Sequence, residues 1–168
     1  MTSPLDPRRS VERFRPVTRA ARFPDDVAAV RRLFTAYAAG LPISLCFQGF
    51  ADELATLPGR YAAPNGAVLL AEYDGAAIGV VAVRPLEPGV CEMKRLFVDP
   101  AHRGHGVSRT LAEGILAQAR SQGYQRIRLD TLADMHPARR LYESLGFAEI
   151  DAYYQNPDPR AVFYEMGL

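Results

Sequence analysis

Three apolar runs in the middle of the chain constrain the fold most strongly. They read "GAVLLAEY" (66–73), "AAIGVVAVRPL" (76–86) and "GVCEMKRLFVDP" (89–100), and they are rich in valine and leucine. Asp74-Gly75 separates the first two, and this dipeptide is typical of a tight hairpin turn. Three extended runs with no helical segment between them predict three neighbouring antiparallel strands at the centre of the domain.

Helical patterns precede these strands. In "DDVAAVRRLFTAYAAGL", residues 25–41, apolar side chains recur every three or four positions at Val27, Val30, Leu33, Phe34 and Tyr37. Asp25 or Asp26 is expected to cap the start of this helix, and Gly40 follows its end. A second, short helix is predicted in "FADELATLPG", and "PVTRAAR" ahead of both favours a short first strand.

The C-terminal part alternates between the two patterns. Val107, Leu111, Ile115 and Ala119 predict a helix that ends near Gly123. A strand in "QRIRLDTL", a helix in "PARRLYESLGF", and strands in "AEIDAYY" and "AVFYEMGL" follow. The predicted order is β-α-α-β-β-β-α-β-α-β-β, an α/β (α+β) fold with a mixed, mostly antiparallel sheet flanked by helices. Residues 1–15 are expected to form a loose tail, and residues 16–168 a single domain.

Composition excludes several classes of protein. Twenty Lys and Arg residues against 19 Asp and Glu leave a net charge of +1, so nucleic acid is not expected as a partner. The N-terminal stretch has no apolar core of a secretory signal, and no apolar run approaches the roughly 18–20 residues that span a bilayer, so no membrane partner is expected. Cys46 and Cys91 fit neither metal nor redox spacing, and we expect reduced thiols in a cytoplasmic protein. The histidines, His102, His105 and His136, form no metal set with a cysteine, so no metal is expected.

The segment "RGHGVSR", residues 103–109, joins the central strands to the next helix. A helix N-terminus leaves backbone N–H groups unpaired and carries partial positive charge. Glycines let an anion approach that backbone closely, and Arg103 and Arg109 add fixed charge on both sides. The pattern predicts a phosphate site. The alternative is a glycine-rich turn with two arginines in solvent.

Two common nucleotide motifs do not match this loop. A P-loop requires Gly-Lys-Ser/Thr at the helix entrance, which is missing. A dinucleotide fingerprint requires a third glycine where Arg109 stands. The pattern Arg-x-x-Gly-x-small does match, through Arg103, Gly106 and Ser108.

The segment "CEMKRLFVDPAHRGHGVSRTL", with "ARRLYESLGF" some thirty residues later, strongly resembles the GNAT-type N-acetyltransferase superfamily. The resemblance implies the GNAT fold and acetyl-CoA as co-substrate. It also implies that the glycine loop wraps the pyrophosphate and that the preceding strand pairs with the pantetheine arm. The residues so assigned are Leu96, Phe97, Val98, Arg103, Gly104, His105, Gly106, Val107, Ser108 and Arg109. Ser108 replaces the usual glycine or alanine, and Met135 stands where many members have asparagine.

Acetyl transfer to an amine requires removal of a proton from the amine and protonation of the departing thiolate. The resemblance assigns these roles to Glu92 as general base and Tyr142 as general acid. Burial of Glu92 inside a strand is expected to raise its affinity for a proton, which a general base needs. The alternatives are an ion pair of Glu92 with Lys94 and a packing role for Tyr142. A backbone N–H of Phe97 or Val98 is expected to stabilise the oxyanion.

Further candidate residues concern a covalent acyl-enzyme intermediate and the pocket for the acceptor. An acyl-cysteine at Cys91 is conceivable, but neighbouring strand residues point to opposite faces, so Cys91 should face away from Glu92. Weaker candidates for the acceptor pocket are Glu53, Tyr61, Tyr153, Tyr154 and Asn156. The expected function is an acetyl-CoA-dependent N-acetyltransferase that acts on a primary amine of a small molecule, or of a peptide or protein, by direct attack in a ternary complex. A non-catalytic acyl-CoA-binding domain is the alternative, and a homodimer is left open.

Overall fold

A computed structural model describes residues 13–168. Its helices are α1 (Val27–Ala39), α2 (Phe50–Ala55), α3 (Val107–Ser121) and α4 (His136–Leu145). Its strands are β1 (Val17–Ala20), β2 (Ala67–Tyr73), β3 (Ala76–Glu87), β4 (Val90–Val98), β5 (Arg126–Leu132), β6 (Ala148–Ile150) and β7 (Ala161–Gly167). Short 3-10 helices occupy Cys46–Gln48, Gly59–Tyr61 and Pro100–His102. This order of helices and strands confirms the predicted one.

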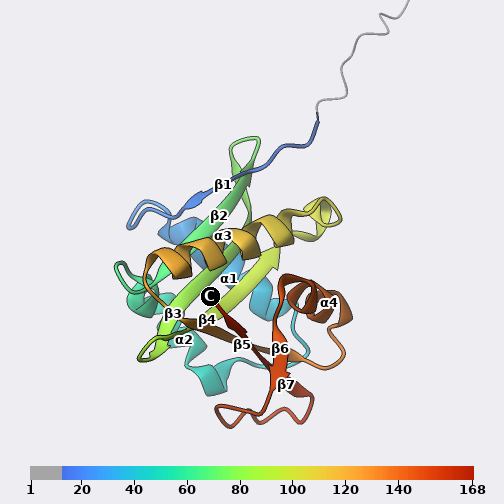
Figure 1. Cartoon of the computed structure of the whole chain (residues 1–168). Coiled ribbons are helices and arrows are strands. Elements are labelled where there is room, and N and C mark those ends of the chain that lie inside the picture. Colours follow the sequence, from blue (N-terminus) through green and yellow to red (C-terminus); the bar gives the residue numbers. More distant parts are fainter. Residues whose placement is uncertain (1–12) are drawn as a thin grey trace, which may run out of the picture.

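All seven strands form one sheet, in the order β1-β2-β3-β4-β5-β7-β6 (Figure 1). The hairpin predicted at Asp74-Gly75 joins β2 and β3, and both of these residues have positive φ. β4 and β5 pair in parallel, whereas every other pair of neighbours is antiparallel. The mixed, mostly antiparallel sheet expected from the sequence is therefore confirmed.

Helices cover both faces of the sheet (Figure 1). On one face, α3 packs through Leu111 and Ile115, both fully buried, onto β2, β3 and β4. On the other face, α1 packs through Leu33 and Phe34 onto β3 and β4. The apolar side chains recur every three or four residues in α1 and every four residues in α3, which places them on one face of each helix.

Two details differ from the sequence predictions. Asp26 stands at the N-cap of α1 but makes no side-chain capping bond. Its carboxylate instead accepts two hydrogen bonds from Arg19, at 2.7 and 2.9 Å, and one from the backbone N–H of Arg22, and these contacts lower the pKa of Asp26 to about 2. An ion pair with β1 thus replaces the local cap.

The strand predicted in "AEIDAYY" was wrong in its second half, because β6 ends at Ile150. The chain then turns so that the rings of Tyr153 and Tyr154 pack edge-on against Phe163 of β7. Their hydroxyls bind buried carboxylates, which a regular edge strand would not allow.

Residues 1–12 of the expected tail lie outside the described residues. Phe14 belongs to the part of the predicted tail that the structure describes, and it packs against Tyr73 with ring centroids 4.5 Å apart. Within residues 13–168, no helix is both long and apolar enough to cross a membrane.

Replacement of Leu111 by alanine should lower the free energy of unfolding by about 2–5 kcal/mol, because it leaves a cavity between α3 and the sheet. Arg120→Ala, on the exposed surface of the same helix, is the control and should change it by less than about 0.5 kcal/mol. Urea unfolding followed by circular dichroism measures both. Equal effects would show that α3 is not packed as described.

Candidate active site

A gap between β4 and β5 forms the site. The two strands pair only from Val90 to Glu92, opposite Arg126 to Arg128, and no pairing continues beyond that point. A cavity of about 630 Å³ occupies the gap, and residues 93–98 of β4 and 129–132 of β5 line it. This volume suits a ligand of ordinary cofactor or drug size.

A β-bulge at the middle of β4 shapes the wall of the cavity. Phe97 pairs with Val80 and Lys94 with Ala82, so Arg95 and Leu96 together face the single residue Val81. Arg95 has a φ of 62°, in the left-handed region that non-glycine residues rarely occupy. Such strain is found mainly where the surrounding structure enforces it, often at functional sites.

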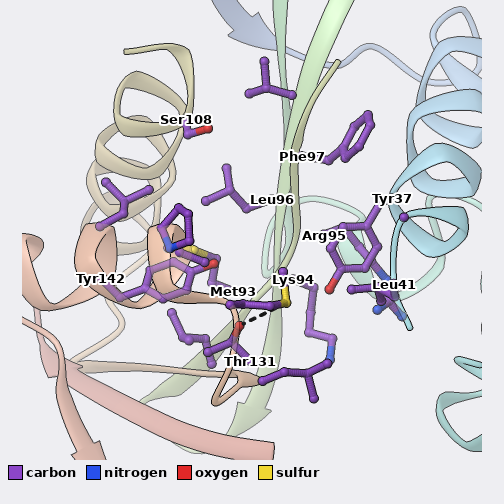
Figure 2. Close-up of a pocket in the computed structure, with 18 of the residues that line it drawn as sticks. Tyr37, Leu41, Met93, Lys94, Arg95, Leu96, Phe97, Ser108, Thr131 and Tyr142 are labelled. Atoms are coloured by element: carbon purple, nitrogen blue, oxygen red, sulfur yellow. Dashed lines mark hydrogen bonds between the residues drawn. The ribbon is translucent and has the colours of Figure 1, made fainter. Parts of the chain in front are cut away.

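The cavity extends to both sides of β4 (Figure 2). Ser108 of α3 and Tyr142 of α4 lie on one side, and Tyr37 of α1 and Leu41 lie on the other. A ligand held in this cavity would therefore pass through the sheet.

The glycine loop lies at one end of the cavity, as the sequence predicts. Gly104 and Gly106 have φ values of 82° and 78°, and Gly106 is the N-cap of α3. No side-chain capping bond is made at this helix start among the described residues, so the N–H groups of its first turn remain open to a ligand. The conformation fits an anion site.

The residues predicted to contact the coenzyme line the cavity, except His105. The ring of His105 instead packs against Phe14, with centroids 4.7 Å apart. Arg103 donates from Nε to the carbonyl of Val98 at 2.9 Å, which ties the loop to the end of β4. Arg109 donates to Ser144 Oγ at 2.6 Å and remains nearly half exposed.

Tyr142 extends from α4 toward β4, as Figure 2 shows, and lines the cavity. Its side chain also packs on Phe147 and Tyr164, so the alternative packing role is present, and its position in the cavity is compatible with the predicted one. Burial raises the pKa of Tyr142 well above its usual range. The phenol is therefore protonated near neutral pH, as a proton donor requires.

Glu92 does not line the cavity. Its carboxylate is 2% exposed and accepts hydrogen bonds from Arg84 Nε at 2.9 Å and from the Tyr153 hydroxyl at 2.7 Å. The ion pair considered for Glu92 and Lys94 was wrong, because Arg84 takes that place and Lys94 faces Asp130. Any contact between Glu92 and an acceptor therefore needs an intervening group.

Among the weaker candidates, only Asn156 lines the cavity. The others support charged groups beside it. Glu53 accepts two hydrogen bonds from Arg95, and the Tyr61 hydroxyl binds Glu53 in turn. Tyr153 and Tyr154 donate to Glu92 and Asp130, respectively.

Sequence reasoning missed Lys94 and Asp130 as lining residues. Both lie inside strands, and a charged side chain within a predicted strand was the available signal. Lys94 was considered only as a partner for Glu92.

Cys91 is fully buried in the cluster under α3 and does not line the cavity. Burial raises the pKa of its thiol to about 12, so almost no thiolate forms at neutral pH. Among residues 13–168, no group of three or more His, Cys, Asp or Glu side chains could hold a metal ion.

Comparison with known proteins agrees with this geometry. The model of the acetyltransferase (GNAT) family matches residues 30–147. The chain belongs to the GNAT acetyltransferase family. A relative from Schizosaccharomyces pombe, named an uncharacterised N-acetyltransferase, is 39% identical over 89% of this chain and 93% of its own length. The enzyme class predicted from the sequence, N-acetyltransferase, is confirmed.

Solved structures share the fold. A GNAT-family acetyltransferase from Staphylococcus aureus matches 91% of this chain and 99% of its own with a TM-score of 0.75 at 18% identity. An acetyltransferase from Salmonella typhimurium has a structure that contains its cofactor acetyl-CoA. It matches 90% of this chain and 93% of its own with a TM-score of 0.66 at 20% identity. The predicted GNAT fold is thereby confirmed for this acetyltransferase.

The buried thiol of Cys91 should resist modification. In the folded enzyme, Ellman's reagent should react with the exposed Cys46 and release one equivalent of chromophore, with the second released only after denaturation. Cys46→Ser should lose the fast phase and Cys91→Ala should keep it. A fast reaction in Cys46→Ser would restore Cys91 as a candidate nucleophile.

Proposed function

We propose that this GNAT acetyltransferase transfers the acetyl group of acetyl-CoA to a primary amine by direct attack in a ternary complex. One observation carries the proposal: the open N-terminus of α3 lies at one end of a cavity that passes between β4 and β5, with the Tyr142 phenol inside it. A single cavity thus combines an anion site, an extended strand and a proton donor.

The coenzyme would lie along β4. Amide groups of Val107 and Ser108 would bind the pyrophosphate, and Arg103 and Arg109 would add positive charge. Backbone groups of Leu96 and Val98 would pair with the pantetheine arm. One N–H of Phe97 or Val98 would stabilise the oxyanion that forms when the amine adds to the thioester carbonyl.

Two proton transfers complete the proposal. The Tyr142 phenol donates its proton to the sulfur as the carbon–sulfur bond breaks, so that CoA leaves as a thiol. Glu92, which does not line the cavity, accepts the amine proton through an intervening water molecule. The first step begins from the protonation state that the surroundings favour, since burial keeps the Tyr142 phenol neutral.

A non-catalytic acyl-CoA-binding domain is the second candidate. It would need the glycine loop but no proton donor, and Tyr142 inside the cavity favours the enzyme. Release of free CoA in the presence of a panel of amines separates the two functions.

Acetyl-CoA should raise the melting temperature, because a ligand that binds only the folded state stabilises it by about 2.7 kcal/mol at a hundredfold excess over Kd. ATP and NAD at the same concentration should not, since the loop lacks both nucleotide motifs. Differential scanning fluorimetry measures all three. Gly106→Val is the control: its side chain is strained at a φ of 78°, so the acetyl-CoA shift should vanish. Equal shifts by all three nucleotides would contradict the assignment.

Tyr142→Phe should lower kcat with little change in the Kd of acetyl-CoA, because only expulsion of the thiolate loses its acid. Glu92→Gln should lower kcat by roughly 10²–10³-fold, and the loss should shrink at high pH, where more acceptor is already deprotonated. Steady-state kinetics across pH measures both, with Cys91→Ala as a nearly silent control. A dead Cys91→Ala enzyme with ping-pong kinetics would overturn direct transfer.

A further inference from the structure

Lys94 is a buried lysine whose amino group has few hydrogen-bond partners. It is the only lysine of the chain, its side chain is 4% exposed, and it lines the cavity. An ammonium group has three N–H donors, yet among the described residues its Nζ has one partner, Asp130 Oδ1 at 3.5 Å. That distance is at the long limit of a hydrogen bond, and the other two donors have no hydrogen-bond partner among the described residues.

Asp130 is itself engaged elsewhere. Its other oxygen, Oδ2, accepts hydrogen bonds from the Tyr154 hydroxyl at 2.5 Å and from Asn156 Nδ2 at 3.3 Å. Two other donors therefore share Asp130 Oδ2, and only Oδ1 faces Lys94. Burial lowers the pKa of Lys94, and an additional anion beside it would oppose that shift.

The other cations that line the cavity are already occupied or lie at the glycine loop. Arg95 donates to both oxygens of Glu53 and to Gln48, with its guanidinium over the rings of Tyr37 and Phe50. Arg103 and Arg109 belong to the loop, and Lys94 lies four residues before the end of β4, about 13 Å from it along the strand. The pyrophosphate of a coenzyme at the loop therefore does not supply the missing anion.

We propose that Lys94 binds a carboxylate of the acceptor, so that the substrate is a small amine that also carries a carboxylate, such as a free amino acid. This inference rests on the proposed function, because it assigns the acceptor end of the same cavity. The ammonium would donate two hydrogen bonds to the carboxylate, while the amine lies further along β4 near the bulge. Asn156 lines the cavity as well, and because its side-chain amide donates to Asp130 Oδ2 and to the Tyr154 hydroxyl, it would hold Asp130 in place rather than contact the carboxylate.

Matched acceptors test the proposal. Each amino acid of a panel is paired with the amine that lacks its carboxylate, for example phenylalanine with phenethylamine. The wild type should show the higher kcat/KM for the carboxylated member of the pairs that it uses. Lys94→Met should lower that value by roughly 10–100-fold, mainly through KM, with little change for the amine, as expected for one charged hydrogen-bond contact. A wild-type preference for the carboxyl-free amines, or an equal loss for both members, would overturn the proposal. The second result would point to a role of Lys94 in proton transfer.

Controls separate charge loss from misfolding. Arg120→Gln removes an exposed positive charge on α3 and should leave both values unchanged. Lys94→Met with Asp130→Asn removes the pair together, so that no lone buried carboxylate destabilises the fold. Both Lys94 variants should keep the thermal shift by acetyl-CoA, which shows that the coenzyme end is intact.

A binding measurement decides the point without turnover. Because Lys94 is the only lysine, protein labelled with ¹³C at lysine Cε gives one lysine resonance by NMR. Addition of N-acetylphenylalanine to the CoA-loaded protein should move this resonance, and N-acetylphenethylamine should not. An unmoved resonance together with equal affinity of wild type and Lys94→Met for N-acetylphenylalanine would overturn the carboxylate contact. Absence of CoA release with every amine, while the resonance still moves, would instead contradict the proposed transferase function and leave the contact supported.

Discussion

The separation of β4 from β5 is the constraint on which the rest of the site depends. Parallel strands in one sheet normally continue to pair, yet here only three residues of each strand do so. Beyond Glu92, the backbone groups on the facing edge of β4 have no strand partner, and the cavity lies along them. An unpaired strand edge inside a protein is costly unless something pairs with it. An extended ligand such as a pantetheine arm would satisfy these groups.

The bulge in β4 gives the two ends of the cavity different chemistry. Because Arg95 and Leu96 share one partner, the alternation of side chains is interrupted between Lys94 and Phe97. Arg95 is thereby fixed between α1 and α2, where Glu53 and two aromatic rings neutralise and cover it. Beyond the bulge, β4 contributes only the apolar residues Leu96, Phe97 and Val98 to the wall of the cavity. Before the bulge it is polar and charged, through Lys94, Asp130 and Asn156.

Buried and partly buried charges of both signs gather around the middle of β4. Arg84 pairs with Glu92, Arg95 with Glu53, and Lys94 faces Asp130. Tyrosine hydroxyls from 61, 153 and 154 supply further hydrogen bonds to the three carboxylates. A network in which nearly every group has a partner is stable when buried, and a group that is under-compensated stands out in it. Lys94 is that group among the described residues.

The sequence by itself determined the order of the helices and strands and the glycine turn at the α3 N-terminus. Those features follow from local patterns: the Asp74-Gly75 hairpin, the four-residue spacing of Leu111 and Ile115, and the glycines at 104 and 106 that accept positive φ. Tertiary structure alone decided which side chains meet. The end of the β4–β5 pairing, the bulge at Arg95 and the turn of the chain after Ile150 depend on contacts between residues distant in sequence. Hence Glu92 pairs with Arg84 rather than with Lys94. Tyr154 lies outside the strand predicted for it, and its hydroxyl donates a hydrogen bond to Asp130. Local periodicity predicts on which face of a strand a charged residue lies. Its hydrogen-bond or ion-pair partner belongs to another helix or strand, which only the tertiary structure brings close.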